Sequence, residues 1–85
     1  MQVLIPTALR SYTRAAYVEA HGPSLAELLA DLDRSYPGLR FRMVDEQDRL
    51  RPHMRVFVNG LAVRELAHPL SPADAVSIVQ ALSGG

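Results

Sequence analysis

The strongest constraint on the fold of this chain is a β-hairpin signal in residues 55–64. Two runs of β-forming residues, 55–58 and 61–64, are separated only by Asn59-Gly60. This dipeptide favours a type I′ turn, because both central positions of that turn need a positive φ angle. The stretch is therefore predicted to form two antiparallel strands joined by a two-residue loop.

The two-residue loop also predicts which residues lie opposite each other. The expected cross-strand pairs are Val58 with Leu61, Phe57 with Ala62 and Val56 with Val63. Because side chains alternate between the faces of a strand, the four branched aliphatic residues of these pairs should share one face. Phe57 is then expected on the opposite face.

One main helix is expected after residue 24. Ser24-Leu25-Ala26-Glu27 matches a capping box, with Ser24 at the N-cap and Glu27 at the third helical position. Apolar residues then recur at helical spacing: Leu25, Leu28, Leu29, Leu32 and Tyr36. This stripe is expected to pack against the sheet, and Pro37-Gly38 ends the helix.

The remaining segments complete a small α+β domain. Residues 3–6, three apolar residues stopped by a proline, are expected to pair with residues 16–20 across a turn at 7–13. Residues 39–51 alternate arginines with acidic residues and are predicted to form an exposed loop. Residues 75–80 are predicted to form the last strand.

The last strand also predicts an outward-facing apolar patch. Val76 and Ile78 should face the core, which places Val79 on the other face. There it would join Phe57 and Leu4 beside the end of the chain.

Composition limits the functions that are open to the chain. Its 85 residues suffice for one small domain, and no apolar run could span a bilayer or act as a signal peptide. The net charge is zero, so binding to nucleic acid or to a membrane is not expected. The chain has no Lys, so no side-chain amine could accept isopeptide chains built on the protein itself. We expect a cytoplasmic protein.

The sequence contains no pattern of a metal or catalytic site. It has no Cys, and His21, His53 and His68 are far apart in predicted loops. Phosphate-binding glycine loops, nucleophile elbows and triads are also missing. We therefore expect neither a metal site nor an enzyme.

The chain ends in Ser83-Gly84-Gly85. Glycine has no Cβ, so Gly84-Gly85 is thin enough to enter a narrow channel of another protein. The terminal carboxylate is then the most distinctive reactive group, although it needs a partner enzyme to activate it. The alternative is an interaction domain whose tail has no task.

Three motifs together resemble the ThiS/MoaD family of ubiquitin-like sulfur carriers. They are residues 56–60 with Val63-Arg64, the turn that ends in Asp74 before the last strand, and Gly84-Gly85. The resemblance covers nearly the whole chain. Residues 5–10 and 31–38 are most similar to the CysO-type carriers of cysteine synthesis within this family.

The resemblance implies a ubiquitin-like β-grasp fold, in which a mixed four- to five-stranded sheet packs on one main helix. Residues 1–85 would form one domain with a flexible tail from about residue 81. An E1-like enzyme would adenylate Gly85 with ATP and Mg, without any cofactor bound stably by the carrier. The product would be converted to a thiocarboxylate and donate sulfur to an acceptor enzyme, either cysteine synthase-like or a molybdopterin synthase large subunit.

The resemblance also implies roles for individual residues. Gly85 would carry the sulfur, Gly84 and Ser83 would thread the partner's active site, and the docking residues would be Phe57, Val79 and Leu82. Two related functions stay open: the small subunit of molybdopterin synthase, and a ubiquitin-like modifier that forms amide links to target lysines.

Overall fold

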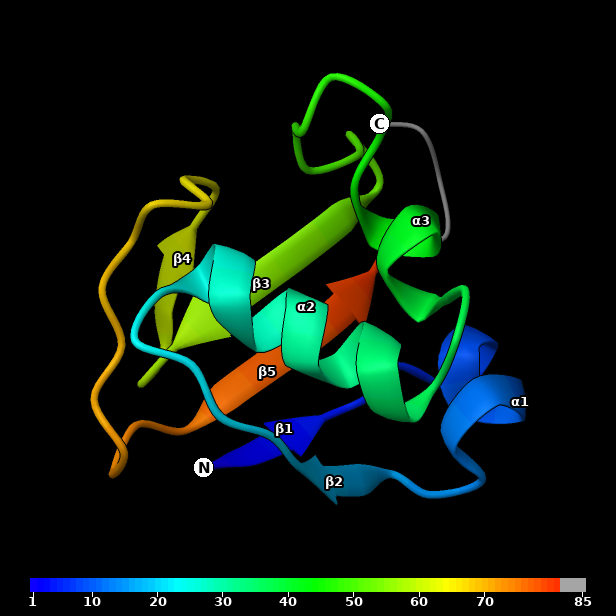
Figure 1. The fold of residues 1–85 in the computed structure, drawn as a ribbon, viewed down its shortest axis with the longest axis horizontal. Coiled ribbons are helices and arrows are strands. Elements are labelled where there is room, and N and C mark those ends of the chain that lie inside the picture. The colour runs from blue at the N-terminus through cyan, green and yellow to red at the C-terminus, as the bar shows by residue number, and fades with distance from the viewer. Residues whose placement is uncertain (82–85) are drawn as a thin grey trace.

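One mixed sheet organises the structure, a computed structural model that describes residues 1–81. The strand order is β2-β1-β5-β3-β4, with β1 parallel to β5 and the other neighbouring strands antiparallel. The elements are β1 (Gln2–Leu4), η1 (Thr7–Leu9), α1 (Arg10–Thr13), β2 (Tyr17–Glu19), α2 (Leu25–Ser35), α3 (Leu39–Met43), β3 (Met54–Val58), β4 (Leu61–Val63) and β5 (Val76–Gln80). Figure 1 shows α2 across one face of the sheet. The predicted β-grasp fold, with one main helix on a mixed sheet, is confirmed.

The predicted pairing of the first two strands is confirmed, but the segment between them differs from the expectation. β1 is antiparallel to β2, with Val3 opposite Val18. Residues 7–13 form the 3-10 helix η1 and the helix α1 instead of a simple turn. These helical turns bury Leu9 and Thr13.

Helix α2 begins where the capping box predicts. The Ser24 hydroxyl accepts a hydrogen bond from the backbone N–H of Glu27 at 3.3 Å and donates to the Glu27 carboxylate at 3.1 Å. The four leucines of the predicted stripe are buried, and Tyr36 packs at the edge of the core. The amphipathic pattern therefore gave the correct inner face of this helix.

The prediction of an exposed loop at residues 39–51 is wrong for the part that packs into the core, although residues 46–49 form an exposed turn as expected. The first part of the segment is helix α3, and a bridge between Val44 and Leu50 closes the rest into a turn. Leu39, Met43 and Val44 have no exposed surface. The segment is thus part of the core, and its charged residues lie on the outside of a packed element.

A side chain from the preceding helix holds α3 in place. The Asp33 carboxylate accepts hydrogen bonds from the backbone N–H groups of Gly38 and Arg40, at 3.1 Å each. Gly38 has a φ angle of 95°, which most side chains disfavour. Asp33 therefore satisfies donors at the start of α3 that the helix itself cannot pair.

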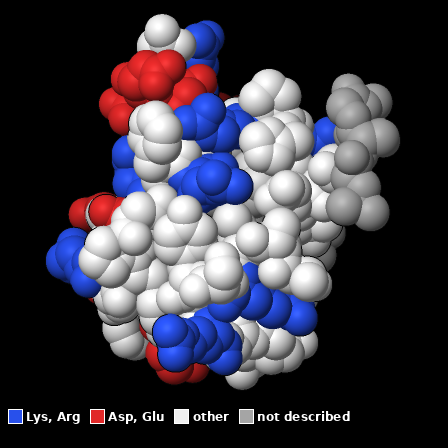
Figure 2. Space-filling view, turned by 90° about the vertical axis from the view of Figure 1, so that its right-hand side faces the viewer, with Lys and Arg blue, Asp and Glu red and all other residues white. Residues whose placement is uncertain are grey.

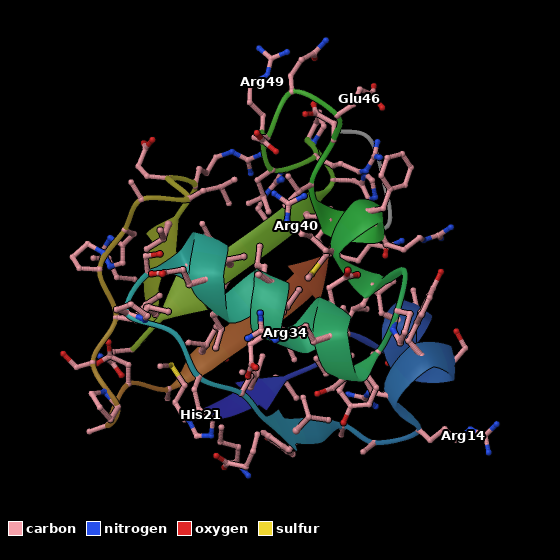
Figure 3. The ribbon with its side chains drawn as sticks, viewed as in Figure 1. Arg14, His21, Arg34, Arg40, Glu46 and Arg49 are labelled. Carbon is pink, nitrogen blue, oxygen red and sulfur yellow. The ribbon has the colours of Figure 1, made fainter. Side chains whose placement is uncertain are left out.

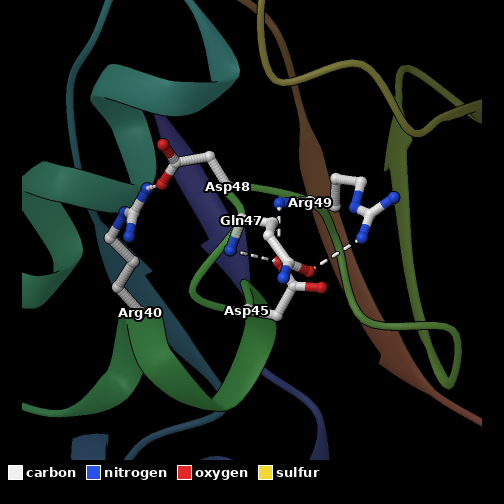
Figure 4. Close-up of polar contacts among 5 residues, drawn as sticks. All are labelled: Arg40, Asp45, Gln47, Asp48 and Arg49. Atoms are coloured by element: carbon white, nitrogen blue, oxygen red, sulfur yellow. Dashed lines mark hydrogen bonds and ion pairs between the residues drawn. The ribbon is translucent and has the colours of Figure 1, made fainter.

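The turn after α3 is fixed by its own polar side chains (Figure 4). The Asp45 carboxylate accepts hydrogen bonds from the N–H groups of Gln47 and Arg49 at 2.9 and 3.1 Å. These bonds lower the pKa of Asp45, with that from Arg49 the largest cause. The Asp48 carboxylate forms an ion pair with the Arg40 guanidinium at 3.2 Å, which ties the turn to α3.

The Asn59-Gly60 hairpin has the predicted register at all three pairs. Asn59 and Gly60 have φ angles of 51° and 83°, as a type I′ turn requires. Val56, Val58 and Val63 are buried, but Leu61 is 66% exposed. The expected face is correct, yet Leu61 lies at the tip of the hairpin on an edge strand and stays outside the core.

Gly22 lies where the segment between β2 and α2 passes against the helix. A Cβ atom at this position would lie 2.4 Å from the backbone nitrogen of Leu28 and 2.7 Å from the carbonyl carbon of Glu27. Both atoms belong to the backbone of α2, so neither can rotate aside. The close approach of the two segments thus requires glycine.

We predict that Gly22→Ala lowers the free energy of unfolding by about 1–3 kcal/mol, because the added methyl group pushes the chain away from α2. Urea denaturation measures the change. Gly60→Asn is the control, since space around Gly60 is open and Asn tolerates its φ angle. A Gly22→Ala variant as stable as the parent chain would contradict this account of the packing.

Candidate docking face and tail exit

The end of β5 determines where the predicted tail leaves the domain. Gln80 lies opposite Met54 of β3, and the N–H of Ala81 donates to the carbonyl of His53 at 2.8 Å. The chain is therefore hydrogen-bonded to the β3 side of the sheet up to residue 81. Four residues of the predicted site lie outside the described part of the chain: Leu82, Ser83, Gly84 and Gly85.

Phe57 and Val79 lie together on the outward face of the sheet, as predicted. In the β3–β5 pairing Phe57 is opposite Ser77 and Val79 is opposite Arg55, which makes Phe57 and Val79 diagonal neighbours. Leu4 of β1 flanks Ser77 on the other side. Val79 is 40% exposed, and Phe57 and Leu4 are half-buried. Their docking role stays a prediction.

A shallow cavity of about 320 Å³ opens beside Val79. Its walls come from the segment after β1, including Pro6, and from the last three residues of β5. Arg10 stands at its edge, where its Nε donates to the carbonyl of Ile5 at 2.9 Å. The cavity can accept an apolar side chain of a partner next to the base of the tail.

Asn59 and Asp74 join two loops at the opposite end of β5. The Asn59 amide donates to the Asp74 carboxylate at 2.9 Å, and its oxygen accepts from the N–H of Ala75 at 3.0 Å. Asp74 also accepts from the N–H of Ser71 at 2.8 Å. This Asn59–Asp74 clasp links the turn between β3 and β4 to the loop that precedes β5. It thereby fixes where β5 begins.

The charges are distributed unevenly although they sum to zero. Within residues 1–81, arginine forms ion pairs only in Arg34–Asp31 and Arg40–Asp48. Every aspartate accepts at least one hydrogen bond in a cap, turn or ion pair: Asp31, Asp33, Asp45, Asp48 and Asp74. Figure 2 shows arginines across the face that carries α1 and α3, with acidic side chains toward its margins.

The titratable side chains do not converge on a centre for chemistry. Among residues 1–81, no group of three or more His, Asp or Glu side chains could hold a metal ion. In Figure 3, His21 and Glu46 project from opposite ends of the molecule. In the same part of the chain, no helix has the length and apolar character needed to cross a membrane.

Sequence reasoning did not identify Phe41 as a site residue. It is 58% exposed on α3, and the Arg51 guanidinium lies 4.8 Å from its ring centroid. The Arg51 Nε also donates to the Phe41 carbonyl at 2.9 Å. The only signal in the sequence was one aromatic residue among arginines. The structure adds that Leu39 and Met43 of the same helix are buried, so that Phe41 faces outward.

Comparison with protein families identifies related chains. The model of the ThiS family matches residues 3–85. The chain is 34% identical to the sulfur carrier protein CysO of Mycobacterium tuberculosis (strain ATCC 25618 / H37Rv) over 89 aligned positions, which cover 98% of this chain and 96% of the relative.

Two solved structures are also similar to this one. CysO in the BexX/CysO complex from Amycolatopsis orientalis is matched with a TM-score of 0.91 and 33% identity, over 99% of this chain and 98% of that one. SAMP1 from Haloferax volcanii is matched with a TM-score of 0.79 and 23% identity, over 100% and 98% of the two chains. At that identity, SAMP1 shares the fold alone.

The Asn59–Asp74 clasp gives a prediction for pH dependence. The bond from the Ser71 N–H, followed by that from the Asn59 side chain, lowers the pKa of Asp74 below its ordinary value. A lowered pKa in the folded state means that the carboxylate stabilises the fold at neutral pH and loses this effect as the pH falls through that pKa. Asp74→Asn should therefore lower the melting temperature at pH 7.

Thermal unfolding followed from neutral to strongly acidic pH measures this effect. The difference between Asp74→Asn and the parent chain should shrink as Asp74 becomes protonated in the parent. Glu46→Gln is the control, because Glu46 makes no hydrogen bond through its side chain within residues 1–81. A constant difference at every pH would contradict the role of the Asp74 charge.

Proposed function

The chain belongs to the ThiS family, and on this basis we propose that it is a sulfur carrier protein whose Gly85 carboxylate becomes a thiocarboxylate. It is a carrier and not itself an enzyme. The main support is that the family match extends to residue 85 and so includes Gly84-Gly85. The identity with CysO favours the synthesis of cysteine as the pathway that receives the sulfur.

The chemistry of the chain agrees with this proposal. A carboxylate is a poor electrophile, so an E1-like enzyme first joins it to the AMP part of ATP and releases pyrophosphate. Sulfide, HS⁻, then attacks the acyl carbon of the adenylate and expels AMP, and loss of the remaining S–H proton leaves the thiocarboxylate on Gly85. The chain contains neither Cys nor Lys, so no side-chain thiol or amine competes for its own activated terminus.

The carrier depends on its partners for catalysis. The adenylating enzyme binds ATP and Mg. It also provides the hydrogen-bond donors that stabilise charge on phosphate and acyl oxygens. A cysteine synthase-like acceptor then receives the tail, in which Gly84 and Ser83 are small enough to thread its active site. The carrier itself holds no stable cofactor, and we place the reaction in the cytoplasm, where ATP is available.

Docking in this proposal uses the outward face near the end of β5. Phe57 and Val79 offer apolar surface there, beside the cavity at Arg10. Leu82, the third proposed docking residue, lies outside the described residues. CysO from Amycolatopsis orientalis was solved in a complex with BexX, which supports recognition of such carriers by another protein.

The intact mass of the protein isolated from its native host tests the proposed function. We expect a population in which one oxygen is replaced by sulfur, with the change mapped to the peptide that ends at Gly85. The same protein from a host without the adenylating enzyme is the control and should lack the change. A terminus that is always a plain carboxylate, with amide-linked adducts on other proteins, would instead support a protein modifier.

We predict that Phe57→Asp weakens binding to the adenylating enzyme by about tenfold or more, because it places a charge at an apolar contact. Isothermal titration calorimetry measures the affinity, and circular dichroism checks the fold. Leu61→Asp is the matched control, since Leu61 is exposed at the hairpin tip and belongs to the other sheet face. Unfolding of Phe57→Asp, or equal affinity of both variants, would contradict the assignment.

A further inference from the structure

Five residues surround the end of β5, and we call them the exit rim: Arg10, Phe41, Arg42, Arg51 and Arg55. Arg10 borders the cavity formed by the last residues of β5. Phe41, Arg42 and Arg51 line a second hollow of about 280 Å³ together with His53, whose carbonyl binds the N–H of Ala81. Arg55 lies opposite Val79 in the sheet.

Three of the rim arginines are held by backbone carbonyl groups. The Nε atoms of Arg10 and Arg51 donate to the carbonyls of Ile5 and Phe41 at 2.9 Å each. Arg55 donates to the carbonyls of Met54 and Pro52. A neutral carbonyl orients a guanidinium without cancelling its charge, so these side chains are partly ordered before any partner binds.

The rim charges are not compensated within the described part of the chain. The ion pairs of residues 1–81 involve the N-terminal amine, Arg34 and Arg40, and none includes a rim arginine. The aspartates are held in caps, turns, ion pairs and the clasp. Asp45 is the one whose pKa a rim arginine helps to lower: the hydrogen bond from the Arg49 N–H is the largest cause, and the charge of Arg51 is a minor one. A molecule of zero net charge therefore presents four arginines around the end of β5, none of them in an ion pair within residues 1–81.

Phe41 adds an apolar contact to this positive rim. It is 58% exposed and stacks under the Arg51 guanidinium, 4.8 Å from ring centroid to Cζ. Aromatic residues and arginine are both enriched in protein interfaces, and arginine is among the residues that contribute most to their binding energy. Its short helix is fixed by buried Leu39 and Met43, so the ring is presented from a rigid element.

We propose that the exit rim docks against an acidic protein surface, which borders the channel of the partner enzyme that receives the tail. The inference rests on the proposed function and adds the chemistry of the partner's surface. A carboxylate accepts two parallel hydrogen bonds from one guanidinium group. An apolar depression between the carboxylates of the partner would accept Phe41. Single-stranded nucleic acid fits less well, because it calls for several aromatic platforms and the rim has one.

Charge reversal at Arg42 tests the inference. Arg42 is exposed and its side chain makes no hydrogen bond within residues 1–81, so Arg42→Glu should leave the fold intact. Arg34→Glu is the matched control, because it makes the same change in net charge on α2, where the Arg34 side chain is 70% exposed (Figure 3). Circular dichroism verifies that both variants fold.

Calorimetry with the adenylating enzyme of the same host gives the readout. We expect Arg42→Glu to weaken binding by about tenfold and Arg34→Glu by less than about twofold. The difference should shrink as salt is added, because salt screens exposed charges. Phe41→Ala, which keeps every charge, should weaken binding at all salt concentrations.

The outcomes separate this inference from the proposed function. Equal affinity of Arg42→Glu and Arg34→Glu, with Gly85 still adenylated, would overturn the rim and leave the carrier function in place. Rim-dependent binding without release of pyrophosphate would support the rim and overturn the carrier function. Rim-dependent binding to a single-stranded DNA oligonucleotide, with none to the enzyme, would overturn the acidic protein partner.

Discussion

The pairing of β5 between β1 and β3 is the constraint on which the rest of the structure depends. It joins the first hairpin to the second, parallel on one side and antiparallel on the other. Val76 and Ile78 face the core under α2, whereas Ser77 and Val79 face outward. One strand thus contributes to the core, to the candidate docking face and to the position of Ala81, and its register sets all three.

The parts of the fold that could be predicted from sequence are those with short-range physical causes. Asn59-Gly60 fixes a turn and therefore a register, and Ser24 with Glu27 fixes the start of a helix. Helix α3 was missed because its cap comes from Asp33, an interaction that spans a change of chain direction. Arg40 and Arg42 lie between Leu39 and Met43, and these charges made the helical spacing of the two buried residues hard to recognise.

The candidate site was predictable to the same extent. Alternation along β3 and β5 was enough to place Phe57 and Val79 on one outward face. The exit rim was not predictable, because its arginines come from distant segments that converge only when the sheet is complete. The zero net charge also concealed it, since a sum over the chain carries no information about where each charge lies.

The position of β5 has a consequence for how the protein is made. The strand that fills the middle of the sheet follows the other described strands in the chain, so the two hairpins cannot be joined until β5 has been made. Contacts between the two ends of a chain also form late, because they close a long loop. A chain cut before β5 would therefore lack the strand that joins its two hairpins into one sheet.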